Sequence, residues 1–168
     1  MTLTTHALVG AAAAQLFPSY PYVAFVAAFA SHFAIDALPH WDYTILSSEK
    51  DLRNPLNNDM RLGKLFFIDL LRIGSDALLG IVLSVIIFAY GIFHAPLVIV
   101  LIGALGGIVP DPLQFVYFKT HTILLEALQR FHIWIQKGKT LRVHPAIGIF
   151  LQVTLVLAVV AIEKIVLH

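Results

Sequence analysis

Hydrophobic residues run almost without interruption along this chain, and short polar segments divide them into five apolar stretches. The stretches cover residues 5–17, 22–38, 65–92, 97–109 and 144–167. A helix that is hydrophobic on all sides belongs in a protein core or in a membrane. The pattern therefore predicts an all-α fold with about five apolar helices.

Proline-containing or polar segments separate the predicted helices. The turn PSYP at 18–21 joins the first two, a polar loop occupies 40–64, and PDP at 110–112 interrupts the fourth. A basic, partly amphipathic stretch at 119–143 predicts a further, interfacial helix. The first apolar stretch reaches only about 20 Å, less than a bilayer core, so it either crosses the membrane or re-enters it.

The overall composition favours the membrane over a soluble core. Of the 168 residues, 59% are hydrophobic and 12% are charged, which is more apolar surface than a soluble domain of this size hides. The length fits one domain, so residues 1–168 are predicted to form a single polytopic, integral-membrane helix bundle. A net charge of +1 argues against nucleic acid as a partner, and the lack of cysteine excludes thiolate metal sites.

The distribution of basic residues predicts the orientation. Both long polar segments, 40–64 and 119–143, are rich in lysine and arginine, whereas the turns at 18–21 and 93–96 contain neither. By the positive-inside rule, both basic segments and the N-terminus lie on the cytoplasmic side of an inner membrane. The C-terminus is then outside, provided that the first stretch crosses.

Ionisable side chains in the apolar stretches collect near this same face. His6 opens the first stretch, the motif HFAIDALPH at 32–40 closes the second, and Asp111 follows the fourth. A charged group in a bilayer is costly, so a group of them predicts a functional site.

The motif at 32–40 suits a metal ion. His32 and Asp36 share one helical face, and Pro39 should end the helix so that His40 folds back. This arrangement fits one metal held by His32 and Asp36, or two metals with Asp36 between them and His40 on the second. Imidazole and carboxylate ligands favour zinc, with manganese or iron as alternatives. Histidines that only satisfy helix-end carbonyls would explain the same residues without a metal.

Other polar residues allow more than one interpretation. Asp111 suits metal ligation or the N-cap of a helix with Pro112 at its first position. Asp69 and Arg72 suit an ion pair, and Asp76 suits a buried ligand or a protonated acid bonded to a neighbouring helix. His121 and His132 are interpreted as interfacial side chains, and Gly103, Gly106 and Gly107 as close-packing positions.

Two resemblances extend the metal hypothesis. HFAIDALPH resembles the signature of zinc-dependent phospholipase C and related nucleases at His32, Asp36, Pro39 and His40. That family has a different spacing around the proline, an N-terminal tryptophan ligand and a soluble fold. THALVGAA at 5–12 and GALGGIVPD at 103–111 resemble an inner-membrane family described as metal-dependent hydrolases. This second resemblance implies His6 and Asp111 as metal ligands.

Together these patterns predict a membrane-embedded, metal-dependent hydrolase of a phosphoester at the cytoplasmic interface. The substrate would be a membrane lipid, either a phospholipid or a polyprenyl phosphate. Metal ions held by His6, His32, Asp36, His40 and Asp111 would activate water, with Asp76 or Asp69 as support or general base. Arg61, Lys64 or Arg72 would bind the phosphate. The alternatives are a divalent-metal transporter and a structural membrane protein without catalysis.

Overall fold

Helices make up most of the chain, as the hydrophobic pattern predicts. The computed structural model describes residues 1–141 and 144–167, so Arg142, Val143 and His168 lie outside the described part. The α-helices are α1 (Leu3–Gln15), α2 (Pro21–Asp36), α3 (Lys64–Ser84), α4 (Leu97–Ile108), α5 (Pro110–Thr120), α6 (Ile123–Gln136) and α7 (Pro145–Leu167). A π-helical segment, η2 (Val85–Gly91), prolongs α3.

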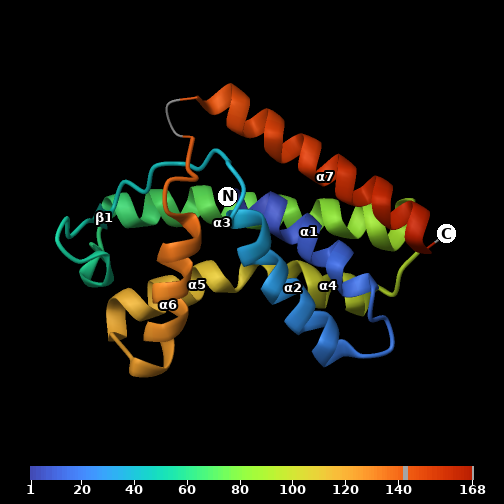
Figure 1. Cartoon of the computed structure of the whole chain (residues 1–168), viewed down its shortest axis with the longest axis horizontal. Helices are drawn as coiled ribbons and strands as arrows, with labels where there is room; N and C mark the ends of the chain where they lie inside the picture. The colour runs from blue at the N-terminus through green and yellow to red at the C-terminus, as the bar shows by residue number, and fades with distance from the viewer. Residues whose placement is uncertain (142–143, 168) are drawn as a thin grey trace.

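The short helix α1 lies at the centre of the bundle. It packs against α2, α3, α4 and α7, and Figure 1 shows α3 behind it and α7 above it. Alanines cover much of its surface, and Ala7, Ala11 and Ala14 are completely buried. Small side chains let neighbouring backbones approach closely, so a helix of this composition suits the middle of a bundle.

Glycines bring α4 against α1, as predicted for Gly103 and Gly107. A methyl group at Gly107 would overlap the carbonyl oxygen of His6, and one at Gly10 would overlap the carbonyl oxygen of Gly103. Only glycine permits this backbone contact. Because His6 belongs to α1 and the Pro-Asp segment follows α4, the contact also brings two predicted site regions together.

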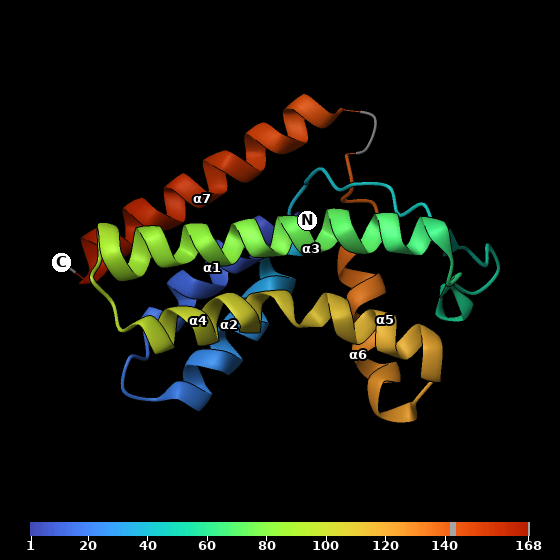
Figure 2. The same ribbon diagram turned by 180° about the vertical axis from the view of Figure 1, so that it is seen from behind.

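Within residues 1–141 and 144–167, two helices are long and apolar enough to cross a membrane. They are the continuous helix Lys64–Gly91, formed by α3 and η2, and α7 over Pro145–Val166. The α4–α5 pair is bent by 42° and makes a third span if it counts as one element (Figure 2). Since α1 has 13 residues and α2 has 16, each is shorter than a bilayer core. The count of five spanning helices therefore stays a prediction.

The polar loop after α2 contains a small hairpin, and this loop packs against α3 and α5. Its strands β1 (Ser48–Glu49) and β2 (Asp59–Met60) are antiparallel and enclose the 3-10 turn η1 (Pro55–Asn57). Asp69 on α3 accepts hydrogen bonds from the backbone N–H and the hydroxyl of Ser47, both at 2.8 Å. Lys119 on α5 lies 2.6 Å from Asp59 Oδ1, and this hydrogen bond lowers the pKa of that carboxyl.

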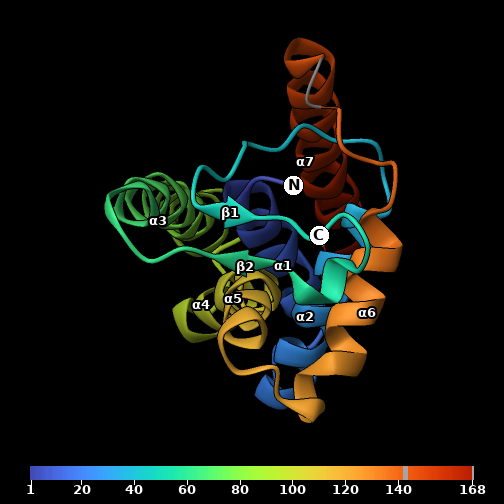
Figure 3. The same ribbon diagram turned by 90° about the vertical axis from the view of Figure 1, so that its left-hand side faces the viewer.

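Helix α6 buries two polar side chains and exposes several large apolar ones, while Arg130 and Glu126 form an ion pair on its outer surface. Gln129 and His132 are buried, whereas Ile123, Leu124 and Trp134 are exposed. This reverses the pattern of a helix on a soluble protein and suits contact with lipid. The predicted interfacial helix is thus present, but its inner face turns toward the ends of α2 and α5 (Figure 3).

Candidate metal centre

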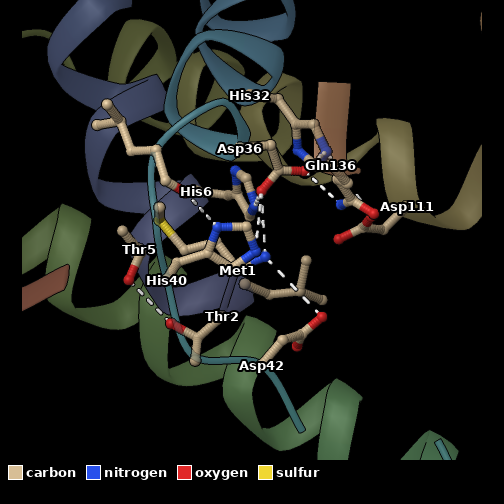
Figure 4. A network of polar contacts seen from close by, with 12 residues as sticks. Met1, Thr2, Thr5, His6, His32, Asp36, His40, Asp42, Asp111 and Gln136 are labelled. Carbon is tan, nitrogen blue, oxygen red and sulfur yellow. Dashed lines mark hydrogen bonds and ion pairs between the residues drawn. The ribbon is translucent and has the colours of Figure 1, made fainter. Parts of the chain in front are cut away.

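Four histidines from different parts of the chain surround the carboxylate of Asp36, the last residue of α2. Asp36 is completely buried. Its Oδ1 lies 3.2 Å from His6 Nε2 and 3.9 Å from His40 Nε2. Its Oδ2 lies 3.3 Å from the Nε2 atoms of both His32 and His132. All four imidazoles thus turn the same ring nitrogen toward one carboxylate (Figure 4 shows three of them).

Asp111 completes the group on the side of His32 and His132. Its Oδ1 lies 3.7 Å from His32 Nε2 and 3.6 Å from His132 Nε2. Among the described residues, two sets of three side chains could each hold a metal ion, because the ligand atoms within each set all lie within 4.8 Å of one another. One set is His6, His32 and Asp36, and the other is His32, Asp111 and His132. We call these residues the His–Asp cluster: His6, His32, Asp36, His40, Asp111 and His132.

Backbone carbonyls determine the tautomer of two of the imidazoles. His32 Nδ1 lies 2.8 Å from the carbonyl oxygen of Gly107, and His40 Nδ1 lies 2.7 Å from that of Leu38. A carbonyl oxygen only accepts, so each Nδ1 carries the proton. When neutral, both rings therefore present the lone pair of Nε2 to the cluster, which is the usual arrangement of a metal-bound histidine.

His6 gives the clearest test of whether a metal fits. Its ring is fully buried and stacks on His32 with ring centroids 3.8 Å apart. Both of its ring nitrogens and His40 Nε2 are buried without a well-oriented hydrogen bond among the described residues. Buried polar atoms are normally satisfied, and a histidine lone pair is the group that a divalent ion coordinates. The donor set therefore fits a metal ion.

Two further groups touch the Asp36 carboxylate. Gln136 on α6 donates from its amide to Oδ2 at 2.6 Å, and the Met1 ammonium lies 3.1 Å from Oδ1. Carboxylate ligands are commonly held by hydrogen bonds of this kind, which set their orientation.

Pro39 acts as predicted, since α2 ends at Asp36 and the chain turns back toward the cluster. The turned segment is then held by the residues that follow α6. His40 donates its backbone N–H to the carbonyl of Lys139 at 3.0 Å and accepts from Leu141 N–H at 2.6 Å. Burial lowers the pKa of His40, as does the nearby Met1 ammonium, and both favour the neutral ring.

Asp76 does not belong to either candidate ligand set and instead binds groups near the start of α1. Its Oδ2 accepts from the backbone N–H of Leu3 at 2.6 Å and from the hydroxyl of Tyr43 at 3.0 Å, and its Oδ1 accepts from the Thr4 hydroxyl at 2.6 Å. It therefore holds the N-terminus of α1, less than one helical turn before His6. Burial, followed by the charge of Asp76, raises the pKa of Tyr43 and keeps this phenol protonated as a donor.

The remaining predicted residues lie apart from the cluster. Asp69 is bound to Ser47, and no described ion pair joins it to Arg72. Arg61, Lys64 and Arg72 are exposed. Asp111 is not an N-cap, because α5 begins at Pro110 and its N-cap position is Val109. The helix starts two residues earlier than expected because Pro110, rather than Pro112, occupies the first position.

The sequence interpretation missed His132 and Gln136. His132 was interpreted as an interfacial side chain, yet it is buried beside Asp36. A weak signal was present, because Gln129, His132 and Gln136 are spaced by three and four residues and form a polar stripe, although the helix also contains Glu126 and Arg130. Such a stripe indicates a helix whose polar face meets a polar partner.

No protein-family model, curated protein or solved structure matches this chain. The functional argument therefore rests on the geometry of the cluster.

Proposed function

We propose that this protein is a membrane-embedded, metal-dependent hydrolase of a phosphoester. The observation that carries the proposal is the convergence of four imidazole Nε2 atoms on the buried Asp36, with the Asp111 carboxylate beside two of them. Two ligand sets that share His32, with one Asp36 oxygen on each side, suit one metal ion or an adjacent pair. The ligands favour zinc, and manganese or iron also use them.

A bound divalent ion would supply the Lewis acidity that polarises a phosphoryl oxygen and activates water. The protein's residues hold that ion and the substrate in position. His32 and His40 are kept in the coordinating tautomer, and Gln136 orients the Asp36 carboxylate. In the reaction, a water oxygen adds to phosphorus while the phosphorus–oxygen bond to the alcohol breaks. The water proton ends on the leaving alkoxide, which gives an alcohol and inorganic phosphate or a phosphomonoester.

The position of the cluster supports a membrane substrate. Two to three helices of the described chain can cross a membrane, and α6 brings His132 to the cluster while its exposed apolar side faces outward. Both basic segments adjoin this end of the bundle. The positive-inside rule then puts the cluster at the cytoplasmic headgroup level of an inner membrane.

An activity assay tests the proposal. Purified protein, loaded with zinc or manganese, is assayed for release of phosphate or of the alcohol from a panel of phosphoesters. We expect hydrolysis by the wild type and by His144→Ala, which changes an exposed histidine outside the cluster, and none by Asp36→Ala. Equal activity in the Asp36→Ala variant would contradict the proposal.

The same preparation separates the transporter alternative. Protein reconstituted in liposomes is tested for uptake of zinc or manganese. Metal flux that depends on Asp36, without any ester hydrolysis, would replace the hydrolase proposal with transport.

A further inference from the structure

A large cavity opens beside the His–Asp cluster. Its volume is about 650 Å³, within the range of pockets that enclose small ligands. Asp111 and Gln136 line one end, where the cavity meets the cluster. The hairpin loop, the first turns of α3, α5 and the end of α6 form its walls, and Figure 3 shows these elements around one end of the bundle.

The wall formed by α3 and α5 is apolar. Phe66 and Phe115 stack with ring centroids 5.3 Å apart, and Phe118, Leu70 and Ile73 extend the surface. Leu70 is 53% exposed, so this wall continues onto the outer face of α3, one of the two helices long enough to span a membrane.

The cavity lining also contains charged side chains, two lysines together with the carboxylates of Asp42 and Asp111. The two lysines are Lys50 from the hairpin loop and Lys137 from the end of α6. A lysine ammonium is a compact donor for phosphate oxygens. The cavity lining thus combines apolar side chains of α3 and α5, two lysines, and the candidate metal ligand Asp111 with Gln136.

We propose that this cavity binds a single-chain lipid phosphate, such as an alkyl or isoprenyl phosphate. The chain lies along Phe66, Phe115 and Leu70, and the phosphate lies between the His–Asp cluster and Lys137. The cavity offers one continuous apolar wall, so it suits one chain better than the two chains of a phospholipid. Turnover of this ligand rests on the proposed function, but its binding does not.

A binding experiment tests the assignment. Metal-loaded protein in lipid nanodiscs is titrated with a fluorescent alkyl phosphate, which is then displaced by dodecyl phosphate, dodecanol or inorganic phosphate. Protein-free nanodiscs correct for partition into lipid. We expect dodecyl phosphate to compete at least tenfold better than either of the other two, a difference of about 1.4 kcal/mol or more. Equal competition by inorganic phosphate or by dodecanol would overturn the proposal, because each lacks one half of the ligand.

Adjacent leucines provide a matched pair of variants. Leu70→Trp fills the cavity, whereas Leu71→Trp adds the same bulk to a neighbouring side chain that is 74% exposed and outside the cavity lining. We expect at least tenfold weaker binding in the first and a change within twofold in the second. Equal effects would overturn the proposal.

A surface variant keeps the test valid if Leu70→Trp fails to fold. Lys137→Ala changes an exposed residue and should weaken the binding of dodecyl phosphate severalfold, whereas Lys164→Ala, at the far end of α7, should not. Unchanged binding in Lys137→Ala would contradict the assigned phosphate position.

The two proposals fail in different ways. Binding with these specificities but without hydrolysis would refute the hydrolase and leave the lipid-phosphate site intact. Metal-dependent hydrolysis that is insensitive to Leu70→Trp and Lys137→Ala would refute the site and leave the hydrolase intact.

Discussion

At the scale of single residues, His32 connects the two halves of the His–Asp cluster. It belongs to both candidate ligand sets and stacks on His6, while its Nδ1 is held by a backbone carbonyl from α4. Asp36 has the complementary position, with each carboxylate oxygen facing a different pair of histidines. Because each oxygen of Asp36 faces its own pair of imidazoles, the carboxylate has the position of a ligand shared by two metal ions.

His132→Ala tests the ligand that the structure adds to the sequence prediction. Removing this imidazole leaves the second ligand set with His32 and Asp111 only. Metal affinity should fall at least tenfold, because even the loss of a residue that only hydrogen-bonds to a metal ligand typically lowers affinity by about that factor. Metal content after dialysis against a competing chelator measures the change. The exposed His144→Ala should retain the wild-type metal content, and retention by His132→Ala would remove His132 from the site.

Asp76→Asn distinguishes support of α1 from catalysis. The carboxylate accepts from Leu3, Thr4 and Tyr43, and an amide cannot replace all of these bonds. We expect a stability loss of about 1–2 kcal/mol, as for a lost helix cap, with metal still bound. Thermal unfolding followed by circular dichroism gives the stability. A loss of hydrolysis with unchanged stability and metal content would instead support the general-base role predicted from sequence.

At the scale of helices, the contact between α1 and α4 positions much of the cluster. It brings His6 beside the Gly107 carbonyl that holds His32, and Asp111 follows four residues later in the chain. The sequence indicates that α4 packs closely against another helix, because glycines in an apolar helix predict close packing. It does not indicate the partner, since nothing in a run of apolar residues specifies which two helices meet.

The five ligands that were predicted from sequence share a local signal. His6, His32, Asp36, His40 and Asp111 each interrupt or end an apolar stretch, so a polar residue stands out against its neighbours. His132 lies in a mixed helix with several polar residues and gives no such contrast. Its position near Asp36 depends on how α6 folds back across nearly 100 residues of chain, which local patterns do not encode.

Gly107→Ala tests the importance of the helix contact. The added methyl group meets the His6 carbonyl, so α1 and α4 must separate, and overpacking of this kind costs about 1–3 kcal/mol. Metal binding should fall with it. Gly74→Ala is the matched control, because nothing lies within 4 Å of its added methyl group, and it should stabilise the helix by about 0.5–1 kcal/mol. Thermal unfolding of the two variants should therefore shift in opposite directions, and a neutral Gly107→Ala would argue against the tight contact.

At the scale of the whole molecule, polar and apolar surfaces are separated along the bundle. The hairpin loop, α5 and α6 lie together at one end of the molecule (Figure 1), whereas α7 and the later part of α3 expose mainly apolar side chains. The helix class and the membrane setting followed from composition. The number of spans stays a prediction, because α1 is buried inside the bundle and both α1 and α2 are shorter than a bilayer core.

The orientation is testable because the chain contains no cysteine. Asn57→Cys places a single thiol in the exposed hairpin loop, and it should react with a membrane-impermeant maleimide only from the cytoplasmic side. Ser19→Cys, in the turn between α1 and α2, reports whether that helix pair reaches the opposite side. Labelling of Asn57→Cys from outside intact cells would reverse the proposed orientation.

The central claim is that the His–Asp cluster binds a metal ion. The most direct measurement is the metal content of protein purified in mild detergent, determined by plasma mass spectrometry for the wild type, His32→Ala and His144→Ala. The account predicts one or two divalent ions per chain in the wild type and in His144→Ala, and loss of this metal in His32→Ala, the ligand that both sets share. A wild type without stoichiometric metal after reloading with zinc or manganese, or a His32→Ala variant that keeps it, would contradict the account.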